Sequence, residues 1–256
     1  MNKKQLYDII FSLGEACSCT QALINNNLRY SSYPFDWLWG GTFLDRVNIL
    51  VSNFNRFIEK NDLVSCEYNN GDQKNLCDVY KNEYTGLVLN HDFPAGVPLE
   101  ESYPMVAEKY QRRINRLLDN IKNADSVLIV YIETPNNKNH TSDKDIICGW
   151  EKIKEKYFNK KIDLLYFMND TTLPPKSVKK ENITSNITKV TANYKNQAPN
   201  VVPYAVDNDV LKSVLKQYSL KTSLGFKIKQ ITKKILIKLI PIKSIRKNLR
   251  KKYHVN

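Results

Sequence analysis

Glycine is scarce in this sequence. Only 8 of the 256 residues are glycine, and they form no glycine-rich phosphate-binding motif. In such motifs the missing side chains let backbone N–H groups approach a nucleotide phosphate closely. The lack of one argues against the usual nucleotide-binding loops.

Cysteine and histidine are also few, and their spacing does not fit a metal site. The five cysteines are an odd number without a C-x-x-C pair, and only three histidines exist, His91, His140 and His254. Zinc sites and disulfide frameworks both need a closer or paired arrangement. We therefore expect reduced thiols, no metal and no cofactor.

Long hydrophobic runs are absent as well. No stretch approaches the roughly 20 apolar residues of a membrane-spanning helix. Asp8 and Glu15 interrupt the apolar N-terminal stretch, which argues against a secretory signal. The hydrophobic content of 42% and charged content of 25% are ordinary for a soluble globular protein, and reduced thiols are the simplest state in a cytoplasmic one.

Apolar segments of strand length alternate with segments of helical periodicity. This pattern predicts an α/β fold with a mostly parallel sheet flanked by helices, a Rossmann-like sandwich, in a single domain over residues 1–220. The expected strands lie at 7–11, 84–90, 126–133, 161–170 and 187–194, and the expected helices at 16–23, 42–60, 104–122, 143–158 and 207–218.

Cys17 stands in the first turn of the helix predicted after the first strand. Unpaired N–H groups and the positive end of the helix dipole lie there, and they should lower the pKa of the thiol. Cysteine is also among the most buried residue types, so a role as apolar filler is the alternative for Cys17 and the better interpretation of Cys19.

Four blocks in the first half of the chain carry a resemblance: SLGEAC at 12–17, LRYSSYPFDW at 28–37, NHDFP at 90–94 and EKYQRRINR at 108–116. In this order they resemble a bacterial family of uncharacterised proteins labelled papain-like cysteine peptidases. The resemblance implies Cys17 as nucleophile and His91 as base. A papain-like fold places its histidine in an antiparallel sheet, which conflicts with the Rossmann-like pattern.

The identity of the acidic residue that would orient the imidazole is left undecided by the sequence. Asp36 and Glu133 are the two candidates, although Asp36 could equally cap a helix or accept local backbone hydrogen bonds. Asp92 should point to the opposite face of the strand from His91. His91 itself could be a hydrogen-bonded structural residue. As residues that bind substrate we expect Gly14, Arg29, Trp37, Asp92 and Arg113.

The net charge of +13 comes almost wholly from the C-terminal tail. Residues 221–252 contain twelve Lys or Arg and no acidic residue, and the rest of the chain carries 27 basic and 26 acidic side chains. Isoleucine and leucine recur in the tail at helical spacing, which is typical of a helix lying on an anionic membrane surface. Aromatic residues are not interleaved with the basic ones as single-stranded nucleic acid requires, so nucleic-acid binding is disfavoured.

Three functions are compatible with these features. The first is a cysteine-dependent hydrolase or acyltransferase with a peptide, acyl or glycan substrate. The second is a glycan-assembly protein without thiol chemistry, which binds a nucleotide or lipid phosphate at the turn 12–14. The third is an inactive docking module. The tail, 221–253, resembles those of glycosyltransferases at the inner face of the cytoplasmic membrane, which suggests surface-polysaccharide assembly.

Overall fold

The computed structural model describes residues 4–66, 76–137, 139–196 and 205–221. The chain divides into two units, Met1–Ser219 and Leu220–Asn256. The account below concerns the first unit. The tail predicted to bind a membrane falls almost entirely outside the described residues.

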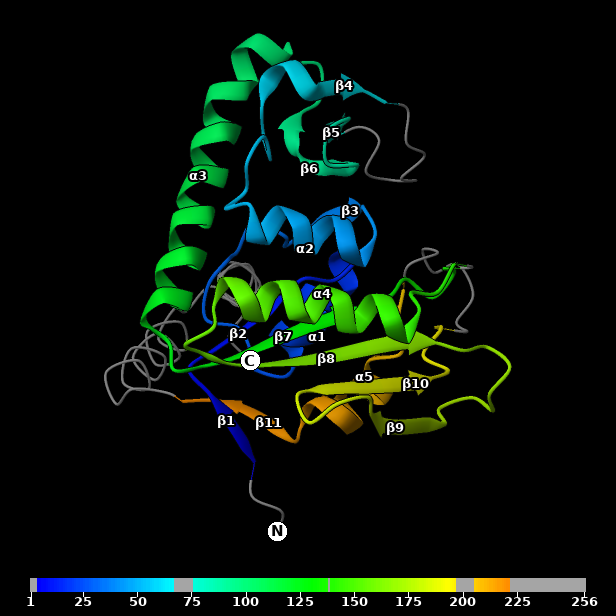
Figure 1. The fold of residues 1–256 in the computed structure, drawn as a ribbon. Helices are drawn as coiled ribbons and strands as arrows, with labels where there is room; N and C mark the ends of the chain where they lie inside the picture. The colour runs from blue at the N-terminus through cyan, green and yellow to red at the C-terminus, as the bar shows by residue number, and fades with distance from the viewer. Residues whose placement is uncertain (1–3, 67–75, 138, 197–204, 222–256) are drawn as a thin grey trace, which may run out of the picture. The chain divides into compact units, whose positions relative to one another are not determined.

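A five-stranded sheet forms the base of this unit (Figure 1). Its strand order is β2-β7-β8-β10-β9. The first four strands run parallel, and β9 pairs antiparallel with β10 at the edge. The strands are β2 (Ile9–Ser12), β7 (Ser126–Ile132), β8 (Lys161–Asn169), β9 (Val178–Asn182) and β10 (Ile187–Ala192).

Helices cover both faces of this sheet. Every residue of β7 is buried, as expected of a central strand that packs on both sides. Helices α2 (Phe43–Val51), α3 (Leu99–Asn123) and α4 (Asp143–Lys156) contribute to the core on one face. Helices α1 (Cys17–Asn25) and α5 (Asn208–Leu215) lie on the other (Figure 1).

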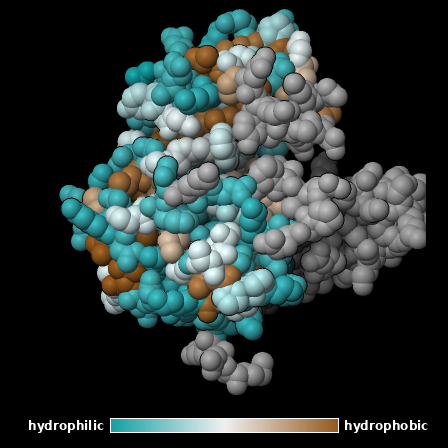
Figure 2. Space-filling model, turned by 90° about the vertical axis from the view of Figure 1, so that its right-hand side faces the viewer, coloured by the Kyte–Doolittle hydropathy of each residue, from teal (hydrophilic) through white to brown (hydrophobic). Residues whose placement is uncertain are grey.

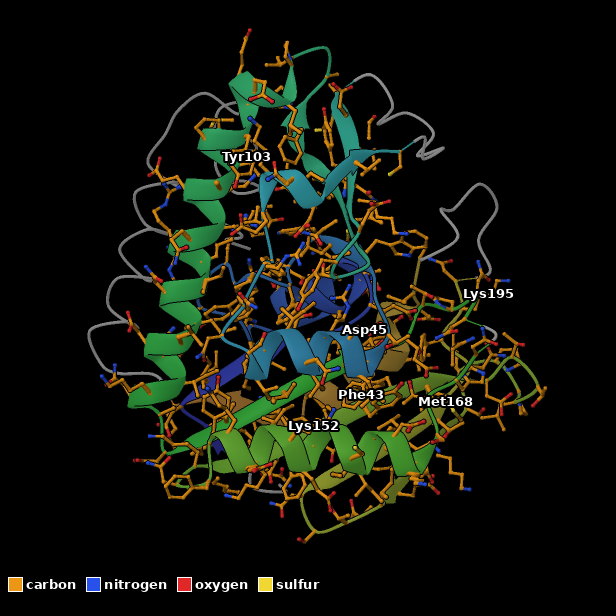
Figure 3. All side chains as sticks on the ribbon, turned by 45° about the horizontal axis from the view of Figure 1, so that its top comes forward. Phe43, Asp45, Tyr103, Lys152, Met168 and Lys195 are labelled. Atoms are coloured by element: carbon orange, nitrogen blue, oxygen red, sulfur yellow. The ribbon has the colours of Figure 1, made fainter. Side chains whose placement is uncertain are left out.

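Helices α2 and α4 pack side by side (Figure 3). Phe43 makes edge-to-face contacts with Tyr131 and Tyr166 of the sheet, with ring centroids 5.2 and 5.5 Å apart. Gly149 of α4 permits this approach, because a Cβ there would lie 2.5 Å from the ring of Phe43. Lys152 adds a 3.0 Å hydrogen bond to Asn48 across the helix pair.

A second sheet is wholly antiparallel, with strand order β3-β6-β5-β4. Its strands are β3 (Leu38–Gly40), β4 (Leu63–Ser65), β5 (Cys77–Asn82) and β6 (Leu87–Pro94), and a short 3-10 helix, η1 (Lys60–Asp62), precedes β4. The expected α/β class is confirmed. The expectation of one mostly parallel sheet is wrong, because the chain builds a mixed sheet and a separate antiparallel one.

The predicted helix over 42–60 ends early, at Val51. Asn53, Phe54 and Arg56 then adopt positive φ angles of 55°, 63° and 54°, which no continuing helix allows. The apolar periodicity continues past Val51 because Phe54 and Phe57 still point into the core, now from a turn. Apolar periodicity alone could not distinguish this turn from a continuing helix.

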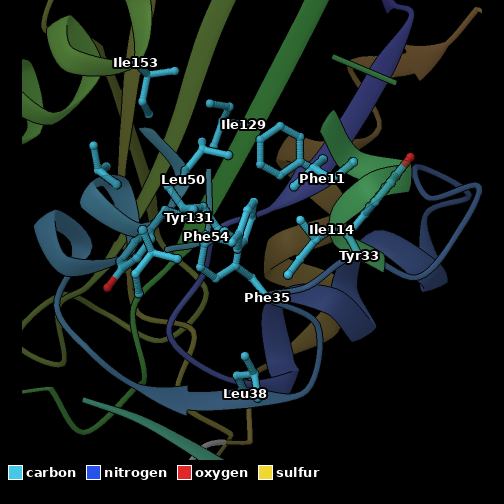
Figure 4. Packing of buried hydrophobic residues seen from close by; sticks show 14 of the residues in the cluster. Phe11, Tyr33, Phe35, Leu38, Leu50, Phe54, Ile114, Ile129, Tyr131 and Ile153 are labelled. Carbon is cyan, nitrogen blue, oxygen red and sulfur yellow. The ribbon is translucent and has the colours of Figure 1, made fainter. Parts of the chain in front are cut away.

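The main hydrophobic cluster joins the two sheets through aromatic side chains (Figure 4). Phe35 packs on Phe54 and Phe57, with ring centroids 5.2 and 5.9 Å apart. Tyr33 meets Phe11 of the parallel sheet at 6.3 Å. The segment that precedes β3 therefore fixes the antiparallel sheet against the parallel one.

A small sheet pairs β1 (Gln5–Tyr7) with β11 (Tyr218–Leu220).

The face drawn in Figure 2 is mainly hydrophilic, and its hydrophobic residues lie in small separate groups. None of the helices in the described ranges has both the length and the apolar run needed to cross a bilayer.

Candidate functional site

Cys17 follows a tight turn at the carboxyl end of β2. Gly14 in this turn admits no side chain, because a Cβ there would lie 2.5 Å from the Cβ of Cys19 and 3.1 Å from the backbone nitrogen of Ile132. Its N–H donates to the Ser12 hydroxyl at 3.2 Å. Gly14 thus allows α1 to lie close to the sheet. None of these contacts of Gly14 bears on its predicted role in binding substrate.

The N-terminus of α1 is open. Its N-cap, Ala16, has an extended backbone and no side-chain cap, and the first turn carries no acidic residue. The first N–H groups of a helix have no intrahelical acceptor. The Ser18 hydroxyl beside them is buried and has no hydrogen-bond partner. The N–H of Cys19 donates to the carbonyl of Ala16 at 3.2 Å, so the donors next to the Cys17 thiol are its own backbone N–H and the Ser18 hydroxyl.

His91 reaches this thiol from the antiparallel sheet. Tyr80 of β5 pairs with Leu89 of β6 and Asp78 pairs with Phe93, so three residues of β6 oppose one of β5. Such a bulge re-aims side chains locally. The Nε2 atom of His91 lies 3.6 Å from the Sγ atom of Cys17, within hydrogen-bond range for sulfur. The structure brings together two residues that are 74 positions apart.

The prediction of a low thiol pKa is wrong. Burial raises the pKa of Cys17 to about 11, which outweighs the lowering by its own backbone N–H and by Arg46. Burial also lowers the pKa of His91, against a smaller opposing effect of Asp92. The resting pair is therefore a thiol that can donate to a neutral imidazole.

Asp36, one proposed third member of the site, does not contact His91. Its buried carboxylate accepts hydrogen bonds from Thr20 at 2.9 Å, from the Arg29 side chain and from the backbone of Tyr33 at 2.8 Å. Asp36 and Arg29 thus form a buried ion pair that fixes the loop before β3. This matches the alternative of local hydrogen bonding, and it gives Arg29 a partner inside the protein.

Glu133, the other proposed acid, belongs to a different cluster. Its fully buried carboxylate accepts from Tyr166 at 2.7 Å and from Thr141 at 3.3 Å, and lies 2.7 Å from Nδ1 of His140. Within the described ranges, no carboxylate accepts a hydrogen bond from the second ring nitrogen of His91. The site described by these contacts is a dyad.

Two other predicted binding residues, Asp92 and Arg113, contact Tyr110 of α3. Asp92 points away from the thiol and accepts from Lys109 at 2.6 Å and Tyr110 at 2.7 Å, both on α3. Arg113 lies 5.3 Å from the Tyr110 ring, and its Nη1 atom is buried without a partner. These contacts tie β6 to α3.

Trp37 is the predicted binding residue that lines a cavity next to Cys17. Its backbone adopts a φ of 68°, which is uncommon for a bulky residue and occurs most often at functional sites. The cavity has a volume of about 310 Å³. Its described lining is uncharged and consists of Cys17, Ser18, Gln21, Trp37, Asn196, Ala205, Val206 and Asn208.

Arg46, which binds the turn before Cys17, could not be recognised as a site residue from the sequence. Its Nη2 atom donates to the carbonyl of Glu15 at 3.2 Å. Its position on the predicted helix 42–60, between Asp45 and Val47, looks like that of any charged surface residue. Only its complete burial distinguishes it.

Hydrogen bonds connect the second, third and fourth sequence blocks to one another or to α1. Thr20 of α1 binds Asp36 of the second block, and Arg116 of the fourth donates to the carbonyl of Ser32 at 2.8 Å. Lys109 of the fourth block binds Asp92 of the third. These contacts link α1, the loop before β3, strand β6 and helix α3.

In the part of the chain that the structure describes, the dyad has no group of metal-ligating side chains beside it. Among the described residues, no three His, Cys, Asp or Glu side chains are grouped closely enough to hold a metal ion. Cys66, Cys77 and Cys148, like Cys17 and Cys19, are free thiols.

Residues 8–171 match the model of a protein family described as "Putative papain-like cysteine peptidase (DUF1796)". The matched region contains all four blocks and both residues of the dyad. Neither the comparison with curated proteins nor the comparison with solved structures gave a match.

Proposed function

The chain belongs to this family of papain-like cysteine peptidases, and on that premise we propose that it is a cysteine-dependent hydrolase or acyltransferase with Cys17 as nucleophile and His91 as general base. The observation that carries the proposal is the 3.6 Å approach of Sγ to Nε2 at an uncapped helix N-terminus. Nucleophile and base within hydrogen-bond reach are the signature of covalent acyl transfer.

The reaction would begin from the neutral pair. As Sγ of Cys17 attacks a substrate carbonyl, its proton moves to Nε2 of His91 and an S–C bond forms. The carbonyl electrons move to an oxyanion, which the open N–H groups of α1 and the Ser18 hydroxyl would stabilise. The imidazolium then protonates the leaving group as its bond to carbon breaks, which leaves a thioester.

His91 would next take a proton from water while the water oxygen attacks the thioester. Collapse of that intermediate returns the proton to Sγ and releases a carboxylic acid. If an acceptor amine or hydroxyl replaces water, the same groups transfer the acyl group. The two outcomes therefore share one mechanism and differ only in the acceptor.

The cavity next to Cys17 is suited to bind an uncharged group of the substrate. Its lining offers the Trp37 ring, two small apolar side chains and the carboxamides of Gln21, Asn196 and Asn208. A charged substrate group would lose its hydration there without gaining a counter-charge. An amphipathic group, such as a neutral peptide side chain or a sugar ring, fits this lining.

The test uses p-nitrophenyl acetate as a small acyl donor, with intact-protein and peptide mass spectrometry. Wild type should show a burst of nitrophenolate and an acetyl group on Cys17 that disappears with time. Cys17→Ser should lose the burst, and Cys148→Ser, which removes an exposed thiol, should keep it. A Cys17 that is acetylated no faster than Cys148 would contradict the proposal and favour phosphate binding at the open helix N-terminus.

We also propose that residues 221–253 attach the protein to the inner face of the cytoplasmic membrane, where its substrate would belong to surface-polysaccharide assembly. Twelve basic residues without an acidic one support this. Each basic residue near an anionic surface contributes about 1 kcal/mol. The full chain should float with phosphatidylserine vesicles and stay behind with phosphatidylcholine vesicles; equal flotation with both would contradict the electrostatic attachment.

A further inference from the structure

Arg46 is a fully buried cation whose hydrogen bonds all go to neutral groups. It lies on α2 with 0% of its surface exposed. Its guanidinium donates to the carbonyls of Gly40 at 2.7 Å, Glu15 at 3.2 Å and Leu38 at 3.3 Å. Its Nη1 atom is buried without any partner.

A buried charge is normally neutralised by an ion of opposite sign in contact with it, because its desolvation is costly. In the described part of the chain, no carboxylate oxygen lies within 4 Å of the Arg46 guanidinium, whereas Arg29 has Asp36 as its partner. The Glu15 carboxylate attracts the Arg46 charge from a longer distance. It accepts a hydrogen bond from the backbone N–H of Thr134 at 2.7 Å instead of contacting the guanidinium. The other groups that act on Arg46 are Tyr131, Cys19 and Cys17.

The carbonyls that hold Arg46 come from the two segments that frame the candidate site. Glu15 stands two residues before Cys17, and Leu38 follows Trp37 directly. Arg46 therefore joins the turn of the nucleophile to the segment that lines the substrate cavity. Its positive charge acts on the Cys17 thiol. This charge comes from α2, whereas His91 comes from β6.

We propose that Arg46 is a positioning residue whose buried cation compensates the negative charge that develops at Cys17 during acyl transfer. The inference rests on the proposed thiol chemistry and adds to it a source of positive charge for the negative charge on Cys17. Among the charged groups that act on the Cys17 thiol, Arg46 is the cation, and Asp92 and Asp36 are the anions. Both anions already have cationic partners, Lys109 and Arg29.

The first experiment measures the pH dependence of iodoacetamide labelling at Cys17 in wild type, Arg46→Lys and Arg46→Met. Methionine keeps most of the apolar volume and removes the charge, and lysine keeps the charge. At a fixed pH below the thiol pKa we expect Arg46→Met to label about tenfold more slowly, which corresponds to one unit of pKa, and Arg46→Lys to stay within about threefold of wild type. Cys148 in the same samples is the internal control.

If both variants fold and label Cys17 at the wild-type rate, or if both slow equally, the charge has no role and the inference is overturned. Circular dichroism establishes folding. Because the acetylation test compares wild type with Cys17→Ser, a failure of the thiol chemistry itself is seen separately, as the absence of any Cys17 burst in wild type.

A second measurement needs no variant and decides the matter if Arg46→Met does not fold. It compares anionic iodoacetate with neutral iodoacetamide on the wild-type protein. A buried cation behind Cys17 should raise the rate of iodoacetate relative to iodoacetamide at least about threefold above the same ratio at the exposed Cys148. A ratio at Cys17 equal to or below that at Cys148 overturns the inference.

Discussion

The two described histidines occupy opposite kinds of site. His91 lies 3.6 Å from a thiol and has no carboxylate on its second nitrogen among the described residues, whereas His140 lies 2.7 Å from the buried carboxylate of Glu133 and has no nucleophile. A carboxylate beside a histidine is often taken as the sign of a catalytic imidazole. Here the imidazole with a carboxylate holds a loop, and the one without a carboxylate faces the nucleophile.

The largest expected difference between the two sites is in acyl transfer. His91→Ala removes the base next to Cys17, and we expect the burst rate with p-nitrophenyl acetate to fall by about 100- to 10,000-fold. His140→Ala should stay within about twofold of wild type. Stopped-flow absorbance measures both, and equal losses in the two variants would contradict the distinction.

The second difference is in stability. Glu133→Ala leaves Tyr166, Thr141 and His140 without their acceptor, and we expect the free energy of unfolding to fall by about 3 kcal/mol. Glu133→Gln retains an acceptor and is the matched control, with a smaller loss. Urea denaturation measures these values, and the burst rate of the folded variants should remain near wild type. A burst lost at full stability would instead give Glu133 a part in the chemistry.

The third difference concerns the response to acid. His91 must be neutral to accept the thiol proton, and burial lowers its pKa below the usual 6.5. The acetylation rate should therefore rise with pH to a plateau, with its midpoint below 6.5 in wild type and unchanged in His140→Ala. Since the thiol pKa is about 11, we expect no separate thiolate step near neutral pH. A midpoint above 6.5 would mean that a partner stabilises the imidazolium.

The smallest effect should come from Asp92→Asn. The amide still accepts from Tyr110, and the negative charge that raises the pKa values of both Cys17 and His91 is removed. We expect the acid midpoint to move to lower pH and iodoacetamide labelling of Cys17 to accelerate by a few fold. Lys109→Met, which removes the partner and keeps the carboxylate, is the matched control and should move both quantities the opposite way.

The four parallel strands of the mixed sheet and most of its helices could be predicted from the sequence, because these strands are rich in apolar residues. The edge strand β9 is mostly charged and exposed and was not predicted. The segments 126–133, 161–170 and 187–194 coincide closely with β7, β8 and β10. Strands β3, β4 and β5 gave no such signal. They have three, three and six residues and are largely half-exposed, so their pairing depends on partners distant in the chain.

The approach of Cys17 to His91 could be suggested only through family resemblance. Strand alternation predicts that Asn90 and Asp92 share one face and His91 the other, but the bulge in β6 sets where His91 points. Bulges have no reliable sequence signal at this length. The high thiol pKa was also missed, because a helix N-terminus can be recognised in a sequence and the depth of burial cannot.

The uncapped start of α1 has a consequence for directed evolution. Serine at position 16 would cap the helix and add about 1 kcal/mol of stability. The same hydroxyl would then accept the N–H groups on which the proposed oxyanion depends. A library selected for thermal tolerance should therefore enrich Ala16→Ser among inactive clones, and one selected for turnover should retain alanine.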